Sequence, residues 1–177
     1  MDFRIRAATN GDVEGIVRAV KAVYDEYGFT WDAEEYHADL YDPEAFYDRR
    51  GDQFLVAEDS EIRGVIGLCF HETIPGKVGE TALFEGKVRA AGSDCSLERL
   101  YVHPDARRRG IGGELTQEVI RRAKEAGKAA MELWSDKRFG DAHRLYGRFG
   151  AIAIGDRICH DPDQSPEWGL VIDLSGE

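Results

Sequence analysis

The stretch Leu97–Gly113, which reads LERLYVHPDARRRGIGG, joins an apolar strand to a basic, glycine-rich loop and to the start of a long amphipathic segment. Apolar residues recur in that segment with the spacing of a helix, at Ile111, Leu115, Val119, Ile120 and Ala123. Basic residues gather late in it and Gly127 follows, as is typical of a helix C-terminus. The glycines therefore lie at the helix N-terminus, where free backbone N–H groups and the helix dipole favour an anion. Because glycine has no side chain, phosphate oxygens can approach this backbone closely.

Other phosphate-binding loops fit this stretch poorly. No Gly-Lys-Ser/Thr sequence follows the glycines, which excludes a P-loop. Leu115 stands where the third glycine of a dinucleotide-binding fingerprint belongs. On the loop alone, a surface helix with a glycine-rich start and a solvated run of arginines is an alternative interpretation.

Length and charge limit the class of protein. The 177 residues suit a single domain, 1–177, with an ample core. The formal net charge of −11 argues against a nucleic-acid partner, because nucleic acids demand a basic face, and is compatible with a cationic substrate such as an amine. The sequence contains no apolar run of membrane-spanning length and no signal-peptide core at its N-terminus. We therefore expect a cytoplasmic protein without a membrane partner.

The spacing of cysteine and histidine residues gives no sign of a metal centre. Cys69, Cys95 and Cys159 are odd in number and far apart, so we expect reduced thiols. His160 lies beside Cys159 and Asp161, which invites a metal hypothesis, but no further ligands follow at metal-binding spacing. We therefore expect no bound metal.

The pattern of the whole chain predicts a mixed α/β sheet. Strands are expected at residues 3–7, 53–58, 65–70, 95–102, 129–134, 151–158 and 168–174. Helices are expected from a cap at Thr9 or Asn10 to Gly28, from a cap at Asp32 to a break at Pro43, from Ile111 to Gly127, and from a cap at Asp141 to Gly150. The strands before and after the long helix should be parallel. Gly147 costs the last helix about 1 kcal/mol relative to alanine, which suggests close packing there.

Residues 71–94 form the least regular part of the sequence. They hold four glycines and one proline, and predict a long loop with at most a short element near Thr81–Glu85. Because long loops in compact domains are often functional or mobile, a lid over a binding site is one hypothesis and a disordered excursion is the other.

Glu98 places a carboxylate in the middle of an interior strand. Regular alternation would put it on the same face as Leu100 and Val102. A carboxylate there is unusual unless it is paired or functional, and desolvation would raise its pKa. Two interpretations stay open: a general base, and a salt bridge with a neighbour such as Arg99 or Arg144.

Two motifs together resemble those of the GNAT superfamily of N-acetyltransferases. Arg107-x-x-Gly110-x-Gly112, after the strand LERLYVHP, is similar to the acetyl-CoA-binding motif of the family. The later LWSDKRFGDAHRLYGRFGA is similar to its second motif, a strand followed by a tyrosine-bearing helix. The two give a core cofactor motif over 95–127 and a tyrosine-helix motif over 129–151. The resemblance implies the GNAT fold, an α/β fold whose mixed, mostly antiparallel sheet is splayed at its central strands and flanked by helices.

The resemblance also implies a cofactor site and a catalytic pair. Acetyl-CoA would be the co-substrate, held by the residues Leu100, Tyr101, Val102, Arg107, Arg108, Arg109, Gly110, Ile111, Gly112 and Gly113. Glu98 would act as the base, directly or through water, and Tyr146 would protonate the departing sulfur. Spacing alone would instead make Tyr146 a core aromatic residue. Ser135-Asp136 stands where many family members carry a cofactor-binding asparagine, which puts that contact in doubt.

The function expected from this resemblance is the transfer of an acetyl group from acetyl-CoA to a primary amine of a small molecule. The alternatives are a protein N-terminus or lysine as the acceptor, and a non-catalytic acyl-CoA-binding domain. Trp31, Tyr36 and Trp134 are candidates for substrate contact, with core packing as the other interpretation. The resemblance leaves a homodimer possible, and the sequence does not identify the amine.

Overall fold

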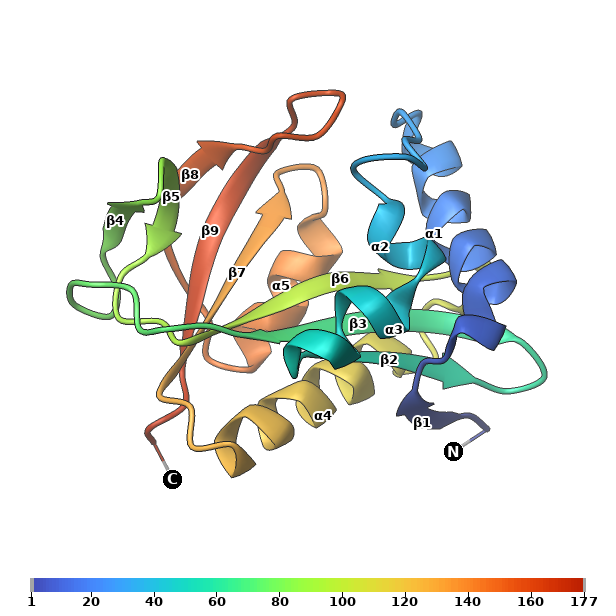
Figure 1. The fold of residues 1–177 in the computed structure, drawn as a ribbon, viewed down its shortest axis with the longest axis horizontal. Helices are drawn as coiled ribbons and strands as arrows, with labels where there is room; N and C mark the ends of the chain where they lie inside the picture. Colours follow the sequence, from blue (N-terminus) through green and yellow to red (C-terminus); the bar gives the residue numbers. More distant parts are fainter. Residues whose placement is uncertain (1, 177) are drawn as a thin grey trace.

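Seven strands form one sheet, and two further strands form a separate hairpin (Figure 1). The computed structural model describes residues 2–176. The sheet has the order β1-β2-β3-β6-β7-β9-β8. Its strands are β1 (Arg4–Ala7), β2 (Gln53–Glu58), β3 (Ile62–Phe70), β6 (Cys95–Val102), β7 (Ala130–Asp136), β8 (Ile152–Ile158) and β9 (Pro166–Asp173). Only β6 and β7 pair in parallel, because helix α4 (Ile111–Glu125) returns the chain between them.

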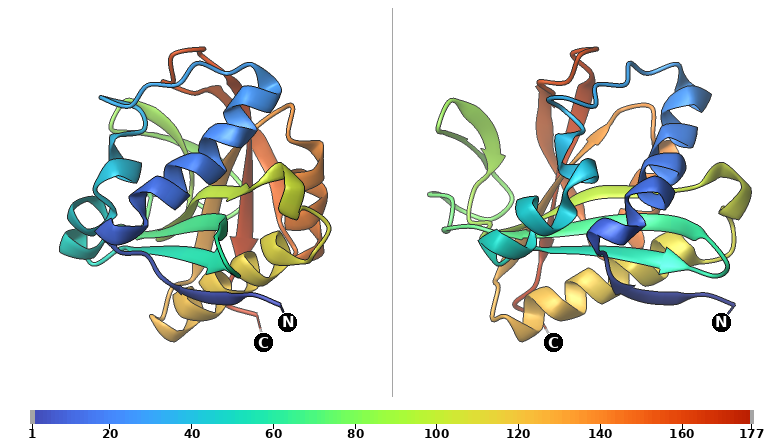
Figure 2. Two further views of the ribbon diagram at one scale, coloured as in Figure 1. Left: turned by 90° about the vertical axis from the view of Figure 1, so that its right-hand side faces the viewer. Right: turned by 45° about the vertical axis from the view of Figure 1, so that its right-hand side comes forward.

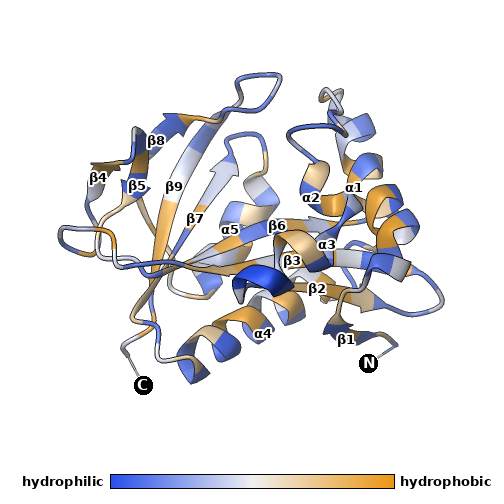
Figure 3. Ribbon diagram, in the orientation of Figure 1, coloured by the Kyte–Doolittle hydropathy of each residue, from blue (hydrophilic) through white to orange (hydrophobic). Residues whose placement is uncertain are grey.

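Helices cover both faces of the sheet (Figure 2). The other helices are α1 (Val13–Tyr27), α2 (Ala38–Tyr41), α3 (Pro43–Phe46) and α5 (Gly140–Arg148), with 3-10 turns η1 (Asn10–Asp12), η2 (Asp48–Arg50) and η3 (Pro104–Ala106). Strand β2 shows the division, since Leu55 and Ala57 pack in one buried cluster with α4 and α5, while Phe54 and Val56 pack in another with α1 and α2. The buried residues of α1 recur at helical spacing on the side that faces the sheet (Figure 3). Within residues 2–176, no helix has the length and apolar character needed to cross a membrane.

A glycine brings the start of α4 close to the sheet. A Cβ atom at Gly64 on β3 would lie 2.8 Å from Cγ2 of Ile111 and 3.1 Å from Cδ1 of Leu115. No larger residue fits there without a shift of the helix. The close approach fixes where the N-terminus of α4 lies relative to the end of β6.

Most predicted elements are confirmed. Each expected strand is present, although β3 begins at Ile62 rather than at Val65. Thr9 and Asp12 form a capping box ahead of α1, and α1 ends at Gly28, whose φ is 70°. β6 and β7 are parallel, as the intervening helix predicted.

Three local predictions about the helices were wrong. Asp32 does accept backbone N–H groups of the residues that follow it, but residues 33–37 form turns, and α2 begins only at Ala38. Helix α5 begins at Gly140 with Phe139 as its cap, so Asp141 lies in the first turn and does not cap the helix. A Cβ atom at Gly147 would meet nothing within 4 Å, so no close packing explains this glycine.

The segment 71–94 contains a short hairpin where a long loop was expected, and the short element expected near Thr81–Glu85 is confirmed as the first strand of that hairpin. Its strands are β4 (Thr81–Phe84) and β5 (Lys87–Ala90), and hydrogen bonds continue beyond them, for example from the Ile74 N–H to the Ser93 carbonyl (2.8 Å). Arg157 on β8 donates to the Val88 carbonyl (2.9 Å), and Glu132 on β7 accepts the Ala90 N–H (2.8 Å). The hairpin is thereby fixed to β7 and β8.

The central strands separate soon after they meet. β6 and β7 pair only at Cys95 with Met131 and at Ser96 with Glu132. Beyond this point β6 continues beside β3, whereas β7 continues beside β9, and Figure 1 shows the two strands diverging. The splay expected at the centre of the sheet is confirmed.

An extra residue in β6 reverses the expected direction of Glu98. Between the pairs Val65–Tyr101 and Gly67–Glu98, β3 advances by two residues and β6 by three, which is a β-bulge. Arg99 occupies the bulge with a φ of 54°. Leu97 and Leu100 consequently face the cluster under α4, while Glu98 lies over Gly67 beside Tyr47, on the α1–α2 face. The prediction that Glu98 shares a face with Leu100 and Val102 was wrong, because strict alternation stops at a bulge.

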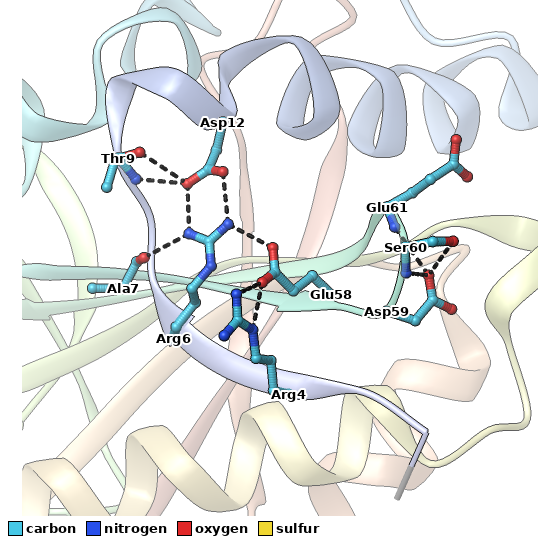
Figure 4. A network of polar contacts seen from close by, with 9 residues as sticks. All are labelled: Arg4, Arg6, Ala7, Thr9, Asp12, Glu58, Asp59, Ser60 and Glu61. Carbon is cyan, nitrogen blue, oxygen red and sulfur yellow. Dashed lines mark hydrogen bonds and ion pairs between the residues drawn. The ribbon is translucent and has the colours of Figure 1, made fainter.

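A charge network joins β1 to the start of α1 and to the end of β2 (Figure 4). Arg6 donates to Asp12 through Nη1 (2.7 Å) and Nη2 (2.8 Å), and Nη2 also donates to Glu58 (2.6 Å). Asp12 accepts the Thr9 N–H as well (2.8 Å). The hydrogen bonds from Arg6 lower the pKa of Asp12 to about 2, so this carboxylate stays ionised at neutral pH and links the first strand to the first helix.

Candidate active site

A cleft of about 730 Å³ lies where β6 and β7 separate. The α1–α2 region walls one side of it, and β7, α5 and the β8–β9 connection wall the other. The hairpin contributes residues 86–89 to the wall. Glu98, Leu100, Tyr101 and Tyr146 all line this cleft, so the fold brings together the predicted base, the predicted acid and the backbone of β6 between them.

Glu98 is exposed to solvent inside the cleft. The partners proposed for a salt bridge are engaged elsewhere, Arg99 with Asp39 and Arg144 with Asp141. Among residues 2–176 the carboxylate has no ion-pair partner. Protein atoms around it remove enough water to raise the pKa of Glu98, and the Ser96 hydroxyl and Arg99 oppose that rise. A raised pKa suits a base that works near neutral pH.

Tyr146 lies on α5 and packs with the cluster under α4, so it reaches the cleft from the face opposite to Glu98. Its residue is 4% exposed. Burial raises the pKa of the phenol, and the nearby Tyr101 and Glu98 add to the effect. Tyr146 therefore holds its proton at neutral pH.

The start of α4 presents free backbone donors. Gly110 is the N-cap residue, with a φ of 82°, and no side chain caps this end of the helix. The helical bond closest to the start runs from the Glu114 N–H to the Gly110 carbonyl (3.0 Å), so the N–H groups of residues 111–113 have no partner within the helix. A Cβ atom at Gly112 would lie 3.4 Å from Leu145 and 3.6 Å from Val102, which places these donors beside β6 and α5. The donors and their surroundings fit a diphosphate.

The three arginines before this helix do not act as one patch in the structure. Arg107 pairs with Glu26 on α1 (2.8 Å), and Arg109 pairs with Asp59 in the β2–β3 turn (2.9 Å). Arg108 has a φ of 61° and is exposed. A role of these side chains in anion binding stays a prediction.

At the end of β6, one backbone N–H group points into the gap between β6 and β7. The His103 N–H donates to the Arg63 carbonyl on the β3 side (2.8 Å). Because successive backbone groups of a strand alternate in direction, the N–H of Val102 points to the opposite edge, where β7 has moved away. This is the arrangement expected for a group that binds a carbonyl oxygen.

The three candidate substrate residues differ in position. Tyr36 and Trp134 line the cleft, whereas Trp31 is not among the lining residues. Trp31 stacks on His37 with the ring centroids 4.0 Å apart, and its Nε1 donates to the Tyr41 hydroxyl (3.1 Å). Contact of any of the three with a substrate stays a prediction, and its support is weakest for Trp31.

Several charged residues of the cleft were missed by the sequence analysis. They come from separate elements, and they are Asp39, Arg89, Glu132, Arg157 and Glu167. Arg89 donates to Glu132 (2.6 Å) and Arg157 to Glu167 (2.9 Å). A signal was present for Glu132, a carboxylate between Met131 and Leu133 in a buried strand, but its partners are distant in the sequence.

Contacts bridge one mouth of the cleft. Thr30, in the α1–α2 connection, donates to Asp163 of the β8–β9 connection through its N–H and its hydroxyl, both at 2.7 Å. Phe139 lies with its ring 5.0 Å from that of Tyr27 and 5.8 Å from that of Phe29. Figure 1 shows the β8–β9 connection reaching toward the α1–α2 connection above the splay. The cleft is therefore partly enclosed between the α1–α2 connection and the β8–β9 connection.

Ser135 and Asp136, which stand where many family members carry an asparagine, contact other residues of the protein. The Ser135 hydroxyl lies 3.1 Å from Nε2 of His143, and Asp136 accepts hydrogen bonds from Arg138. Within the part of the chain that the structure describes, no group of three or more His, Cys, Asp or Glu side chains could hold a metal ion.

Solved acetyltransferase structures share this fold. A GNAT-family acetyltransferase from Staphylococcus aureus Mu50 is 20% identical, with a TM-score of 0.73 over 98% of this chain and 99% of its own. YncA from Salmonella typhimurium, described with its cofactor acetyl-CoA, is 18% identical, with a TM-score of 0.69 over 100% and 96%. A ribosomal-protein-alanine N-acetyltransferase from Brucella melitensis is 20% identical, with a TM-score of 0.68 over 96% and 99%.

These distant structures show the fold alone. The family is shown by comparison of the sequence. No curated protein sequence matches the chain significantly. The model of the acetyltransferase (GNAT) family matches residues 18–151. This range includes the glycine-rich start of α4, the diverging strands β6 and β7, and helix α5, which carries Tyr146. The chain therefore belongs to the GNAT family of acetyltransferases.

Proposed function

We propose that this chain transfers the acetyl group of acetyl-CoA to the primary amine of a small molecule, with Glu98 as the base and Tyr146 as the acid. One observation carries the proposal. Glu98 and Tyr146 line a single cleft from opposite faces of the sheet, at the place where β6 and β7 separate. A carboxylate without an ion-pair partner among residues 2–176 and a protonated phenol thus lie on either side of a splayed backbone.

The donor side of the proposal rests on the start of α4. The N–H groups of residues 111–113 would hold the diphosphate, and the N–H of Val102 would meet the thioester carbonyl. Acetyl-CoA supplies the activated acetyl group. The family membership and a fold neighbour described with acetyl-CoA support this choice of donor.

Glu98 prepares the acceptor. An alkyl ammonium has a pKa of about 10 and must lose a proton before its nitrogen can attack. Glu98 accepts that proton, directly or through one water, and its raised pKa improves it as a base. The nitrogen then forms a bond to the carbonyl carbon while the carbon–sulfur bond breaks.

Val102 and Tyr146 complete the reaction. The Val102 N–H stabilises the negative charge that develops on the carbonyl oxygen. Tyr146 gives its proton to the sulfur as the bond breaks, and the second proton that the nitrogen loses restores the phenol through solvent. The proton on Glu98 leaves to solvent, so one proton is released for each amide formed.

The bridged mouth supports a small acceptor. The Thr30–Asp163 hydrogen bonds join the two walls of the cleft, and the ring of Phe139 lies 6.4 Å from that of Tyr101. An amine of a few carbons can be enclosed under such a bridge, whereas a folded protein that presents a lysine or an N-terminus needs an open groove. A protein acceptor is the second candidate, because one fold neighbour is a ribosomal-protein-alanine N-acetyltransferase.

A thiol-release screen tests the proposal. Acetyl-CoA is mixed with a panel of small primary amines and a matched panel of short peptides, and free thiol is measured. We expect turnover with small amines and little with peptides. Turnover with peptides alone would favour the protein acceptor, and acetyl-CoA binding by calorimetry without turnover on any amine would favour a non-catalytic binding domain.

Tyr146→Phe tests the acid separately. The variant keeps the ring and removes the proton, so we expect kcat to fall by roughly 100-fold while the Kd of acetyl-CoA is unchanged. Because the sulfur protonation is the step affected, an amine acceptor with a less basic nitrogen should not rescue it. A variant that works at the full rate would remove Tyr146 from the mechanism.

A further inference from the structure

The backbone at Arg99 is unusual for a strand. Four residues other than glycine have a positive φ within residues 2–176: Glu85, Arg99, Arg108 and Gln164. Only Arg99 lies inside a strand, since the others are in turns and loops. A non-glycine residue in the left-handed region costs about 1–2 kcal/mol, so surrounding contacts must hold it there.

Those contacts come from Asp39 on α2. Arg99 donates to Asp39 through Nε (3.1 Å) and Nη2 (2.9 Å), which is a bidentate pair. Nη2 also donates to the Tyr36 carbonyl, and the guanidinium lies 4.6 Å from the centroid of the Tyr36 ring. The Arg99 and Asp39 side chains are only 13% and 14% exposed, so solvent screens the pair weakly.

Asp39 is itself held in place next to Glu98. The Tyr47 hydroxyl donates to Asp39 (2.6 Å), and Tyr47 is buried with its ring stacked on Phe54. A Cβ atom at Gly67, the residue opposite Glu98, would lie 3.2 Å from both Cβ of Glu98 and Cε1 of Tyr47. The network from Tyr47 through Asp39 to Arg99 therefore surrounds the backbone that carries Glu98.

The bulge decides which face Glu98 occupies. With regular alternation from Val102, Glu98 would lie on the face of Leu100 and Tyr146. The extra residue at Arg99 turns Glu98 to the α1–α2 side of the cleft instead, opposite to Tyr146. Whatever keeps Arg99 in the left-handed region also keeps Glu98 at the acceptor.

We propose that Asp39 is a positioning residue that acts through Arg99, holding the β6 bulge so that Glu98 lies on the α1–α2 side of the cleft, opposite to Tyr146. The inference rests on the proposed function, because it assigns Asp39 and Arg99 to the placement of the proposed base. Neither residue exchanges a proton or touches the acetyl group in this scheme.

The pair also sets the charge around Glu98. The titratable groups near Glu98 are Arg99 on its own strand, Asp39 on α2, Cys69 on β3, Glu132 on β7, Tyr146 on α5 and Arg157 on β8. Arg99 lowers the pKa of Glu98, and Asp39 neutralises part of that effect. Removing Arg99 or Asp39 should therefore shift the protonation of Glu98 in opposite directions.

Two variants test the role by kinetics. The acceptor is the small amine with the highest rate in the thiol-release screen, and kcat/KM is measured against pH for Asp39→Asn and Arg99→Gln. We expect both to lose about tenfold or more in kcat/KM. The acid limb of the profile should move to lower pH in Asp39→Asn, where Arg99 loses its counter-charge, and to higher pH in Arg99→Gln. Limbs that move in the same direction, or unchanged profiles in both variants, would overturn the proposal.

A structural readout keeps the test independent of the acceptor. In a crystal structure of Asp39→Ala, we expect Arg99 to leave the left-handed region and Glu98 to leave the α1–α2 side of the cleft. An unchanged bulge with Glu98 still on that side would contradict the role of Asp39, whatever the activity. Should Asp39→Ala not fold, Arg99→Ala carries the same test, because it removes the same ion pair and leaves a residue that disfavours a positive φ.

Controls separate this proposal from the proposed function. Acetyl-CoA affinity, measured by calorimetry, should be unchanged in every variant that folds. If Glu98→Gln retains the wild-type rate, the proposed base is wrong. If Glu98→Gln is inactive while Asp39→Asn and Arg99→Gln match the wild type in rate and pH profile, only the positioning role fails.

Discussion

Glu98 and Glu132 are glutamates on the neighbouring strands β6 and β7, and both line the same cleft. In the sequence they look alike, since each is a carboxylate in a strand of mostly apolar residues. Glu132 is 1% exposed and accepts hydrogen bonds from Arg89 (2.6 Å), the Ala90 N–H (2.8 Å) and Trp134 (3.1 Å). Glu98 is exposed in the cleft, and within residues 2–176 it has no ion-pair partner.

The difference shows that the hydrogen-bond partners of a carboxylate in a strand, more than its burial, indicate what it does. The lone pairs of Glu132 are occupied, so this carboxylate joins the β4–β5 hairpin to the sheet. The oxygens of Glu98 are free to accept a proton from a ligand. Burial alone would have favoured Glu132 as the candidate base, because it is the more deeply buried of the two.

Replacing Glu98 should give the largest effect on activity. Glu98→Gln keeps the size of the side chain and removes its basicity, so we expect kcat/KM with a small amine to fall by roughly 10²- to 10⁴-fold. The midpoint of unfolding should hardly change, since no ion pair is lost. The thiol-release rate and a thermal melt measure these two effects. A stable variant with undiminished activity would show that Glu98 is not the base.

Replacing Glu132 should have the converse effect. Glu132→Gln leaves Arg89 without its counter-charge in a site from which water is largely excluded, so we expect the free energy of unfolding to fall by about 2–3 kcal/mol. Urea unfolding at pH 7 measures this loss. Activity per folded molecule should stay within a few-fold of the wild type, and a stable but inactive Glu132→Gln would make Glu132 a part of the catalytic machinery.

Much of the fold could be predicted from the sequence because its signals are local. The strands and the helices α1 and α4 are marked by apolar periodicity, and Thr9 and Gly28 mark the ends of the first helical region. The glycines at 110–113 predicted the start of α4 correctly. Such patterns lie within one turn or one strand of the residues that they specify.

What could not be predicted depends on partners far apart in the chain. The hairpin at residues 81–90 looked like a loop because each of its strands has only four residues, and its attachment to Glu132 and Arg157 lies more than forty residues away. The bulge at Arg99 is held by Asp39, sixty residues earlier. Alternation within β6 therefore gave the wrong face for Glu98.

Asp12 is a third carboxylate that extends the comparison, because it is paired with an arginine as Glu132 is, but nearer the surface. Its pKa is about 2 in the folded chain and about 4 when unfolded, so its contribution to stability is complete above about pH 5 and is lost as the pH falls toward 2. We expect Asp12→Asn to lower the free energy of unfolding by about 1–2 kcal/mol at pH 7, after allowance for solvent. Urea unfolding at pH 7, 4 and 3 should show the gap to the wild type narrowing, and a gap that is constant with pH would mean that Arg6 does not stabilise the ionised carboxylate.

Replacing Gly147 on α5 should give the smallest effect on stability. Like Glu98, it is an unusual residue within a regular element, but a Cβ atom there would meet nothing within 4 Å, and its φ is not positive. Alanine should therefore fit without strain, and Gly147→Ala should raise the free energy of unfolding by about 0.5–1 kcal/mol by favouring the helix. Gly112→Ala is the matched control, since its Cβ atom would lie 3.4 Å from Leu145 and should gain less. A loss of stability in Gly147→Ala would mean that α5, and with it Tyr146, needs a freedom of the backbone that its open surroundings do not explain.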